Sequence, residues 1–253
     1  EDEQTREITR VVAAMDGRPV TVRTLDIGAD KLAAALTDGL GDGRSSALGL
    51  RGIRLSLKQR EMLETQLRAC LRASAHGPVR ILLPMVTTPS EVRKAREILE
   101  RAAHRIRRRR AGVPEKLPPV GAMIEVPGAA LAADALAKVC DFFAIGSNDL
   151  TMYTLATDRA YETVAHLFDP LHPAVLRLMQ FAFEAGMRAG IPVSICGEIA
   201  GDPRFAALLV GLGFRELSMA AANLPRVKQR IRAMDALAAR QRALLIMDQV
   251  DSV

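Results

Sequence analysis

Polar and charged side chains in this sequence gather where short apolar runs end. Arg23 lies near the end of one such run, Glu125 follows a second, Asn148 and Asp149 follow a third, and Cys196 ends a fourth. An apolar run that ends in a polar group ahead of Gly or Pro indicates a buried strand with that group at its rim. In parallel α/β folds the ligand site lies at the carboxyl ends of the strands. We therefore expect the chemistry of this protein to lie at these positions.

Two carboxylates, Glu125 and Asp149, follow apolar runs that are neighbours in the sequence. Carboxylates at adjacent strand ends form a hard-oxygen site that suits Mg²⁺ or Mn²⁺, with the substrate supplying further ligands. The alternative interpretation is a pair of solvated loop acids, which the spacing alone does not exclude.

Three arginines, Arg23, Arg51 and Arg159, lie in the segments that follow apolar runs or open helices. The planar guanidinium group binds phosphate or carboxylate through two parallel hydrogen bonds. These arginines are therefore candidate anion ligands, although each alone is also compatible with an ordinary surface charge.

The cysteines Cys70, Cys140 and Cys196 are far apart and form no Cys-x-x-Cys pair. This spacing argues against a zinc site and against a redox dithiol, and the odd number without a leader sequence favours a reducing, cytoplasmic setting. Cys70 and Cys140 have the surroundings of small core residues. Cys196, beside Gly197, is a candidate nucleophile, proton donor or inert thiol.

Six apolar runs are predicted to be the strands that position these groups. They are nearly continuously apolar, as in parallel strands that are buried on both faces. The predicted strands are residues 19–26, 79–86, 119–126, 141–147, 191–197 and 214–219. The apolar spacing between them predicts helices over residues 2–14, 55–74, 90–109, 129–139, 173–189, 203–212 and 225–234.

Alternation of strands and helices leaves two architectures, a doubly wound sheet or a (β/α)8 barrel. A barrel needs eight strands, so under that interpretation this chain lacks the first two and has six. The 253 residues, 49% hydrophobic and 25% charged, can bury a full core and exclude general disorder. No apolar stretch is long enough for a transmembrane helix.

The net charge of +6 fits a small anionic ligand, whereas aromatic residues make up only 4% and Trp is absent. This argues against a nucleic-acid surface built on base stacking. The basic run at 104–110 (HRIRRRR) has two interpretations, a solvated helix end or a site for a polyanion. His166 and His172 have no metal-ligand spacing and are expected to have loop or cap roles.

Six motifs together resemble a known family. They are 23–31 (RTLDIGADK), 47–54 (ALGLRGIR), 123–127 (MIEVP), 145–159 (IGSNDLTMYTLATDR), 169–173 (DPLHP) and 195–202 (ICGEIAGD). In this order they resemble the carboxy-terminal, phosphoenolpyruvate-binding domain of the Enzyme I family, the phosphotransferases of the bacterial sugar phosphotransferase system. The likeness extends from about residue 2 to about residue 235.

The resemblance implies a (β/α)8 barrel that binds phosphoenolpyruvate and Mg²⁺. It implies that Arg23, Arg51, Asn148 and Arg159 bind the substrate, that Glu125 and Asp149 ligate Mg²⁺, and that Cys196 protonates the enolate carbon as pyruvate forms.

The resemblance also implies a barrel domain over residues 1–235, incomplete at its amino terminus, followed by a C-terminal helix over 236–253. In the family the phosphoryl group passes to a histidine on an N-terminal domain, which is absent from this chain, and then to the carrier HPr. A cytoplasmic homodimer, without nucleic acid or membrane, is expected. The alternatives are the pyruvate phosphate dikinase or phosphoenolpyruvate synthase branch, and a non-catalytic sensing or dimerisation module.

Overall fold

The computed structural model of the chain describes residues 1–27, 47–108, 115–158 and 161–248. Over these residues the fold is α/β, with six strands that alternate with helices, as the sequence predicts. The chain divides into two compact units. Unit 1 contains residues 1–122 and 139–141, and unit 2 contains residues 123–138 and 142–253.

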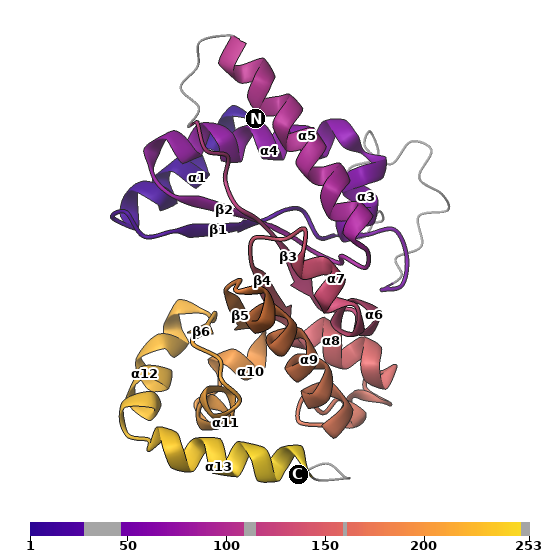
Figure 1. Cartoon of the computed structure of the whole chain (residues 1–253), viewed down its shortest axis with the longest axis vertical. Coiled ribbons are helices and arrows are strands. Elements are labelled where there is room, and N and C mark those ends of the chain that lie inside the picture. Colours follow the sequence, from indigo (N-terminus) through magenta and orange to yellow (C-terminus); the bar gives the residue numbers. More distant parts are fainter. Residues whose placement is uncertain (28–46, 109–114, 159–160, 249–253) are drawn as a thin grey trace. The chain divides into compact units, whose positions relative to one another are not determined.

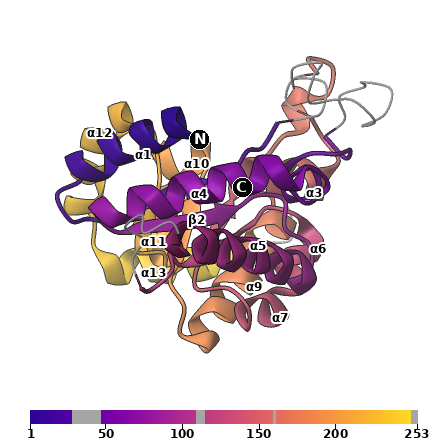
Figure 2. The same ribbon diagram turned by 90° about the horizontal axis from the view of Figure 1, so that it is seen from above.

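Unit 1 is a parallel sheet covered by helices. Its elements are α1 (Asp2–Ala14), β1 (Val20–Arg23), α3 (Gly52–Lys58), α4 (Arg60–Ala73), the 3-10 turn Ser74–His76, β2 (Val79–Leu83), α5 (Pro89–Arg108) and the first three residues of β3 (Val120–Ile124). The central strand β2 pairs in parallel with β1, Val20 opposite Val79, and with β3, Ile81 opposite Val120. Helix α4 lies between α1 and α5, as Figures 1 and 2 show.

The strands and helices of unit 1 follow the burial that their sequences require. In β2 four of the five residues are buried, which accounts for its apolar sequence. Helix α5 buries Val92, Ile98 and Leu99 on one face, and its opposite face carries charged residues. Asp141 links α5 to the start of β3, because its carboxylate accepts hydrogen bonds from Arg96 and from the Val120 amide, both at 2.7 Å.

Unit 2 contains the remaining strands. Its elements are α6 (Pro127–Leu131), α7 (Ala133–Ala137), β4 (Phe143–Gly146), α8 (Ser147–Leu155), the 3-10 turn Ala165–Leu167, α9 (Pro173–Ala189), β5 (Val193–Cys196), α10 (Glu198–Gly201), α11 (Ala206–Gly211), β6 (Glu216–Leu217), the 3-10 turn Ala221–Asn223, α12 (Leu224–Arg232) and α13 (Ala236–Met247). Strand β5 pairs in parallel with β4, Gly146 opposite Cys196, and with β6, Ser194 opposite Glu216.

Small residues let the helices of unit 2 pack closely. Gly211 at the end of α11 lies against the backbone of α13 at Ala239, and a Cβ at that position would be 2.8 Å from the Ala239 carbonyl carbon. Helix α13 therefore packs closely against α11 (Figure 1). On its other face Leu237, Leu244 and Leu245 are exposed.

Several predicted boundaries are wrong. The helix predicted over 55–74 is two helices, α3 and α4, because the backbone leaves the helical region at Gln59. The helix predicted over 129–139 is likewise two, α6 and α7, with the break at Ala132. Every predicted strand exists but is shorter than predicted, and 203–212 contains only the six-residue helix α11. Helix α8 was not predicted.

The predicted C-terminal helix is present as α13, which ends at Met247, and residues 249–253 lie outside the described part of the chain. Among the described residues, no helix is both long and apolar enough to cross a membrane.

Candidate functional site

In unit 1 the carboxylate of Asp26 binds the guanidinium group of Arg51. Arg51 donates from Nε to Oδ1 at 3.0 Å and from Nη2 to Oδ2 at 2.8 Å. The side chain of Asp26 is 2% exposed and that of Arg51 is 16% exposed. Arg23, the last residue of β1, is more exposed and brings its Nη1 to 3.7 Å from the same carboxylate. The two predicted arginines of this unit therefore share one buried acid.

The backbone around Arg51 is fixed by the end of β2. Gly52 opens α3 with φ of +55°, and a Cβ there would be 2.7 Å from the Cβ of Met85 and 3.2 Å from the carbonyl oxygen of Pro84. The Ile53 amide donates to that same oxygen at 3.1 Å. Only glycine fits at position 52, because any other residue would be strained at this positive φ and its Cβ would collide with Met85.

In unit 2 the predicted metal ligands are neighbours. Glu125, which is 1% exposed, directly follows β3, and Asp149 lies in the first turn of α8. A carboxylate oxygen of each lies within 4.8 Å of the other. Gly146 leaves room for this arrangement, since a Cβ there would be 2.7 Å from Oε2 of Glu125. Two carboxylates this close repel each other, which favours a cation between them.

The ends of β4 and β5 are joined by hydrogen bonds. The Ser147 hydroxyl donates to the carbonyl oxygen of Cys196 at 2.8 Å, and the Glu198 amide donates to Oδ1 of Asn148 at 3.2 Å. The Cys196 thiol donates to the carbonyl oxygen of Ile145 at 3.3 Å. Asn148 and Cys196, both predicted from the sequence, are thereby held at adjacent strand ends.

The three cysteines differ in their surroundings. Burial raises the pKa of Cys70 to about 12 and, as the main cause, that of Cys140 to about 12. Cys196 is half-buried. The sequence-based interpretation of Cys70 and Cys140 as core residues is confirmed, and Cys196 is the cysteine with access to solvent.

The structure brings Arg23 and Arg51 together in unit 1, and Glu125, Asn148, Asp149 and Cys196 are at strand ends of unit 2. Arg159 lies outside the described residues. Sequence reasoning missed the role of Asp26 and the helix that carries Asn148 and Asp149.

A signal for the missed helix was available. Ser, Asn and Asp favour helix starts, so Ser147, Asn148 and Asp149 in a row could have predicted the start of α8. For Asp26, its place at the end of the predicted strand 19–26, close to Arg23, was a signal for a strand-end group, but nothing in the sequence indicated its pairing with Arg51.

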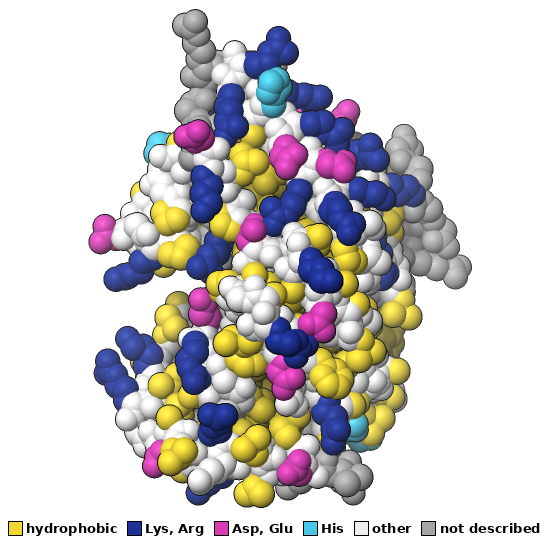
Figure 3. Space-filling view, viewed as in Figure 1, with side chains coloured by type: hydrophobic (Ala, Val, Ile, Leu, Met, Phe, Trp, Pro, Cys, Tyr) yellow, Lys and Arg dark blue, Asp and Glu magenta, His cyan; other side chains and the backbone are white. Residues whose placement is uncertain are grey.

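The other singled-out residues have structural roles. His172 caps α9, because its Nδ1 accepts from the Ala174 amide at 3.2 Å. Basic side chains gather over α5 (Figure 3), and Arg105 pairs with Glu64 at 2.8 Å. Cations in the last turn of α5 complement the helix dipole, which favours the solvated helix end. Residues 109 and 110 of the basic run lie outside the described part.

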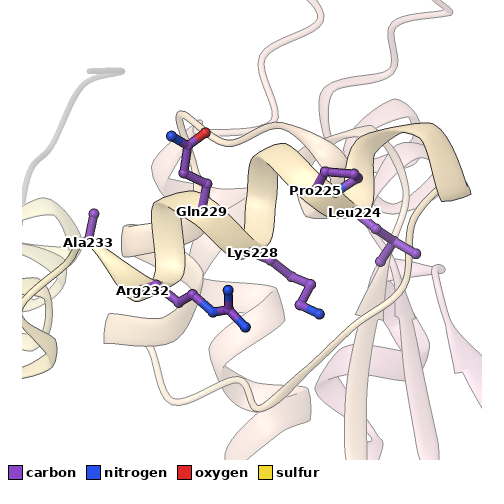
Figure 4. Close-up of a pocket in the computed structure, with 6 residues that line it drawn as sticks. All are labelled: Leu224, Pro225, Lys228, Gln229, Arg232 and Ala233. Atoms are coloured by element: carbon purple, nitrogen blue, oxygen red, sulfur yellow. The ribbon is translucent and has the colours of Figure 1, made fainter.

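A shallow hollow of about 600 Å³ lies along α12 (Figure 4). Lys228 and Arg232 extend to the same side of the helix there, one turn apart. None of the predicted site residues lines this hollow, so it is separate from the strand-end groups.

Comparisons with known proteins give a consistent assignment. Residues 1–236 match the family described as PEP-utilising enzyme, PEP-binding domain. The chain is 50% identical over 231 residues to a phosphoenolpyruvate-protein phosphotransferase of Cupriavidus necator, covering 91% of this chain and 39% of that protein. It is 43% identical to the phosphotransferase of the same name from Haemophilus influenzae, covering 92% and 40%. The chain thus spans about two fifths of the length of these relatives.

A solved structure has a similar fold. A citrate lyase of Burkholderia xenovorans is 20% identical, with a TM-score of 0.50, and the match covers 71% of this chain and 59% of that one. This likeness concerns the fold alone.

Proposed function

We propose a function from the premise that the chain belongs to the family of PEP-utilising enzymes, as a PEP-binding domain. The proposal is that it binds phosphoenolpyruvate for a phosphoenolpyruvate–protein phosphotransferase. The observation that carries it is the 50% identity to a protein of that name over 231 residues. The relatives from Cupriavidus necator and Haemophilus influenzae both carry that name, which favours this function over the dikinase or synthase branch.

The substrate is held by arginine and amide groups in this proposal. Phosphoenolpyruvate carries about three negative charges near neutral pH, so its binding calls for several cations with fixed geometry. Arg23, Arg51 and Arg159 bind its phosphate and carboxylate, and Asn148 donates a hydrogen bond to the phosphate. The support is that Arg51 has a fixed guanidinium group and that Arg23 lies beside the same acid.

The residues present fit a divalent metal ion. Glu125 and Asp149 offer carboxylate oxygens within 4.8 Å, and Gly146 leaves the space that Glu125 occupies. Oxygen ligands of this kind suit Mg²⁺. When bound, Mg²⁺ supplies positive charge that offsets the negative charge of substrate and leaving group.

The chain's own residues then complete the reaction. The bond between phosphorus and the enol oxygen breaks, and the phosphoryl group passes to a histidine of another domain. Arg23 and Arg51 stabilise the charge that remains on the substrate oxygens. The Cys196 thiol donates its proton to the methylene carbon, which yields pyruvate, and the hydrogen bond to Ile145 orients the thiol beforehand.

We further propose the setting of this domain. Residues 1–235 form part of a (β/α)8 barrel, six of whose strands are in this chain, and residues 236–253 are a C-terminal helical extension. The partners are an N-terminal phosphohistidine domain, an HPr-type carrier and a second copy of the chain, in the cytoplasm. The support is the family match and the likeness to relatives that are more than twice as long.

Calorimetric titration of phosphoenolpyruvate, with and without Mg²⁺, tests the proposal. We expect binding that needs Mg²⁺, loss of the Mg²⁺ dependence in Glu125→Gln, and a Kd about tenfold to a hundredfold higher in Arg51→Ala, as for the loss of charged hydrogen bonds. Asp134→Asn, which changes an exposed acid of unit 2, is the control and should bind as wild type. No binding by the wild type would contradict the proposal. Cys196→Ala should keep binding, and in an assay that supplies the domain with the phosphate-accepting histidine it should lose pyruvate formation. A non-catalytic module would form no pyruvate with or without the substitution.

A further inference from the structure

We propose that Asp26 is a positioning residue, which holds the guanidinium group of Arg51 in the orientation that receives the substrate anion. This inference rests on the proposed function, in which Arg51 binds phosphoenolpyruvate. Neither the sequence pattern nor the comparisons assign a role to Asp26.

The first argument is the geometry of the pair. Both carboxylate oxygens of Asp26 are used, one by Nε at 3.0 Å and the other by Nη2 at 2.8 Å. Two parallel hydrogen bonds fix the plane of the guanidinium group, whereas a single one would leave it free to rotate. The direction of the remaining edge of Arg51 is therefore set by Asp26.

The second argument is that Arg51 is fixed at its backbone as well. The contact of Gly52 with Met85 and Pro84 holds the start of α3 against the end of β2. The Leu25 amide donates to Oε1 of Gln66 at 3.1 Å, which fixes the segment next to Asp26. Both ends of the Arg51 side chain are thus held by segments that follow neighbouring strands.

The third argument is the burial of the acid. The side chain of Asp26 is 2% exposed, whereas in the comparable pair of unit 2 the side chain of Asp134 is 67% exposed and that of Arg188 is 58% exposed. Removing a carboxylate from water is unfavourable, and its charge opposes the binding of an anion nearby. A buried acid at this position does not attract the substrate anion, so an effect of Asp26 that acts through Arg51 comes from orientation.

Two hypotheses predict opposite effects of Asp26→Asn on the affinity for phosphoenolpyruvate. If Asp26 acts only through its charge, Asp26→Asn removes a negative charge and phosphoenolpyruvate should bind more tightly. If Asp26 positions Arg51, the substitution replaces one acceptor with an amide donor, the paired hydrogen bonds are lost, and binding should weaken. Ordering one long side chain on binding corresponds to a rise in Kd of about threefold to tenfold.

The experiment is a calorimetric titration of phosphoenolpyruvate with Mg²⁺ into the full chain and its variants. Asp26→Asn is compared with Asp134→Asn, which makes the same change of charge in an exposed pair whose carboxylate also accepts from both Nε and Nη2 of its arginine, through three hydrogen bonds. A double-mutant cycle adds Arg51→Lys, which keeps the charge and loses the planar fork. A purely structural effect of Asp26 would lower affinity equally in both backgrounds.

We expect Asp26→Asn to raise Kd about threefold to tenfold, Asp134→Asn to leave it unchanged, and Asp26→Asn to have little effect when Arg51→Lys is already present. An unchanged or lower Kd in Asp26→Asn, or equal losses in both backgrounds, would overturn the inference. If Asp26→Asn does not fold, Asp26→Glu replaces it, with the same expected rise. Absence of binding by the wild type would instead refute the proposed function itself, and the inference with it.

Discussion

The contact between Gly52 and Met85 predicts the effect of one methyl group. Gly52 is buried and has φ of +55°, and a Cβ there would lie 2.7 Å from the Cβ and 2.8 Å from the Cγ of Met85. Met85 itself has φ of +58°, so its Cβ cannot move away without a shift of backbone that is already strained. Such a shift would also stretch the hydrogen bond from Ile53 to Pro84.

The magnitude follows from two separate contributions. A residue with a side chain in the left-handed region costs about 1–2 kcal/mol relative to glycine. Overpacking a buried site by one carbon adds about 1–3 kcal/mol. Gly52→Ala should therefore lower the free energy of unfolding by about 2–5 kcal/mol, and it should weaken phosphoenolpyruvate binding because Arg51 precedes it.

A matched control separates these contributions. Gly17, also in unit 1, has φ of +76°, and a Cβ there would meet nothing within 4 Å. Gly17→Ala should cost only the backbone contribution, about 1–2 kcal/mol. Urea unfolding followed by circular dichroism measures both, since the chain has no Trp. If Gly52→Ala costs no more than Gly17→Ala, the close packing of α3 on the end of β2 is refuted.

Two further predictions concern the thiols and α13. At pH 8 a thiol with a pKa of about 12 is ionised in about one molecule in ten thousand, so Cys70 and Cys140 should resist iodoacetamide until the chain unfolds, while Cys196 reacts. Mass spectrometry of the labelled peptides checks this, and early labelling of Cys70 would contradict the burial. Gly211→Ala should expose α13 to amide hydrogen exchange, because a Cβ would collide with the backbone of α13. Gly128→Ala, where the Cβ has open space, is the control and should leave α13 protected.

The strands could be predicted because strands that are buried in the structure have apolar sequences. Strands β2, β3 and β4 are almost wholly buried, so each needs a continuous apolar run, and such runs are easily recognised. The predicted strand at 214–219 began too early because Phe214, which was included as an apolar strand residue, packs in the core outside β6. Its ring packs edge-on against Phe183 at 4.9 Å between centroids, outside the strand.

The helix breaks could not be predicted from the same patterns. Apolar spacing continues across Gln59 and Ala132, and neither break contains Gly or Pro. The backbone at Gln59, with φ of −99° and ψ of 66°, departs from the helix although the local helix propensity gives no signal for a break there. Helix α8 was missed because its apolar and polar residues do not segregate to two faces.

In the candidate site, too, some features could be predicted from the sequence and others could not. Residue types at strand ends predicted the candidate side chains, because charge is costly to bury and therefore marks the rim of a sheet. The spacing of residues along the sequence did not predict which of these side chains pair with each other. Asp26 and Arg51 are 25 residues apart, and their pairing depends on the register of β1 with β2 and on the path of the chain into α3.

Glycine explains how the strand ends can hold polar groups without losing close packing. Gly52 admits Met85, Gly146 admits the Glu125 carboxylate, and Gly197, with φ of +100°, lies against Ser147 and Asn148. At each of these positions a methyl group would displace a side chain or the backbone of a neighbouring element. Polar residues at a strand end predict where ligands bind, and the adjacent glycines predict that their geometry is fixed before the ligand arrives. A site built this way has little freedom to adjust, so its affinity should depend on residues such as Asp26 that do not themselves meet the substrate.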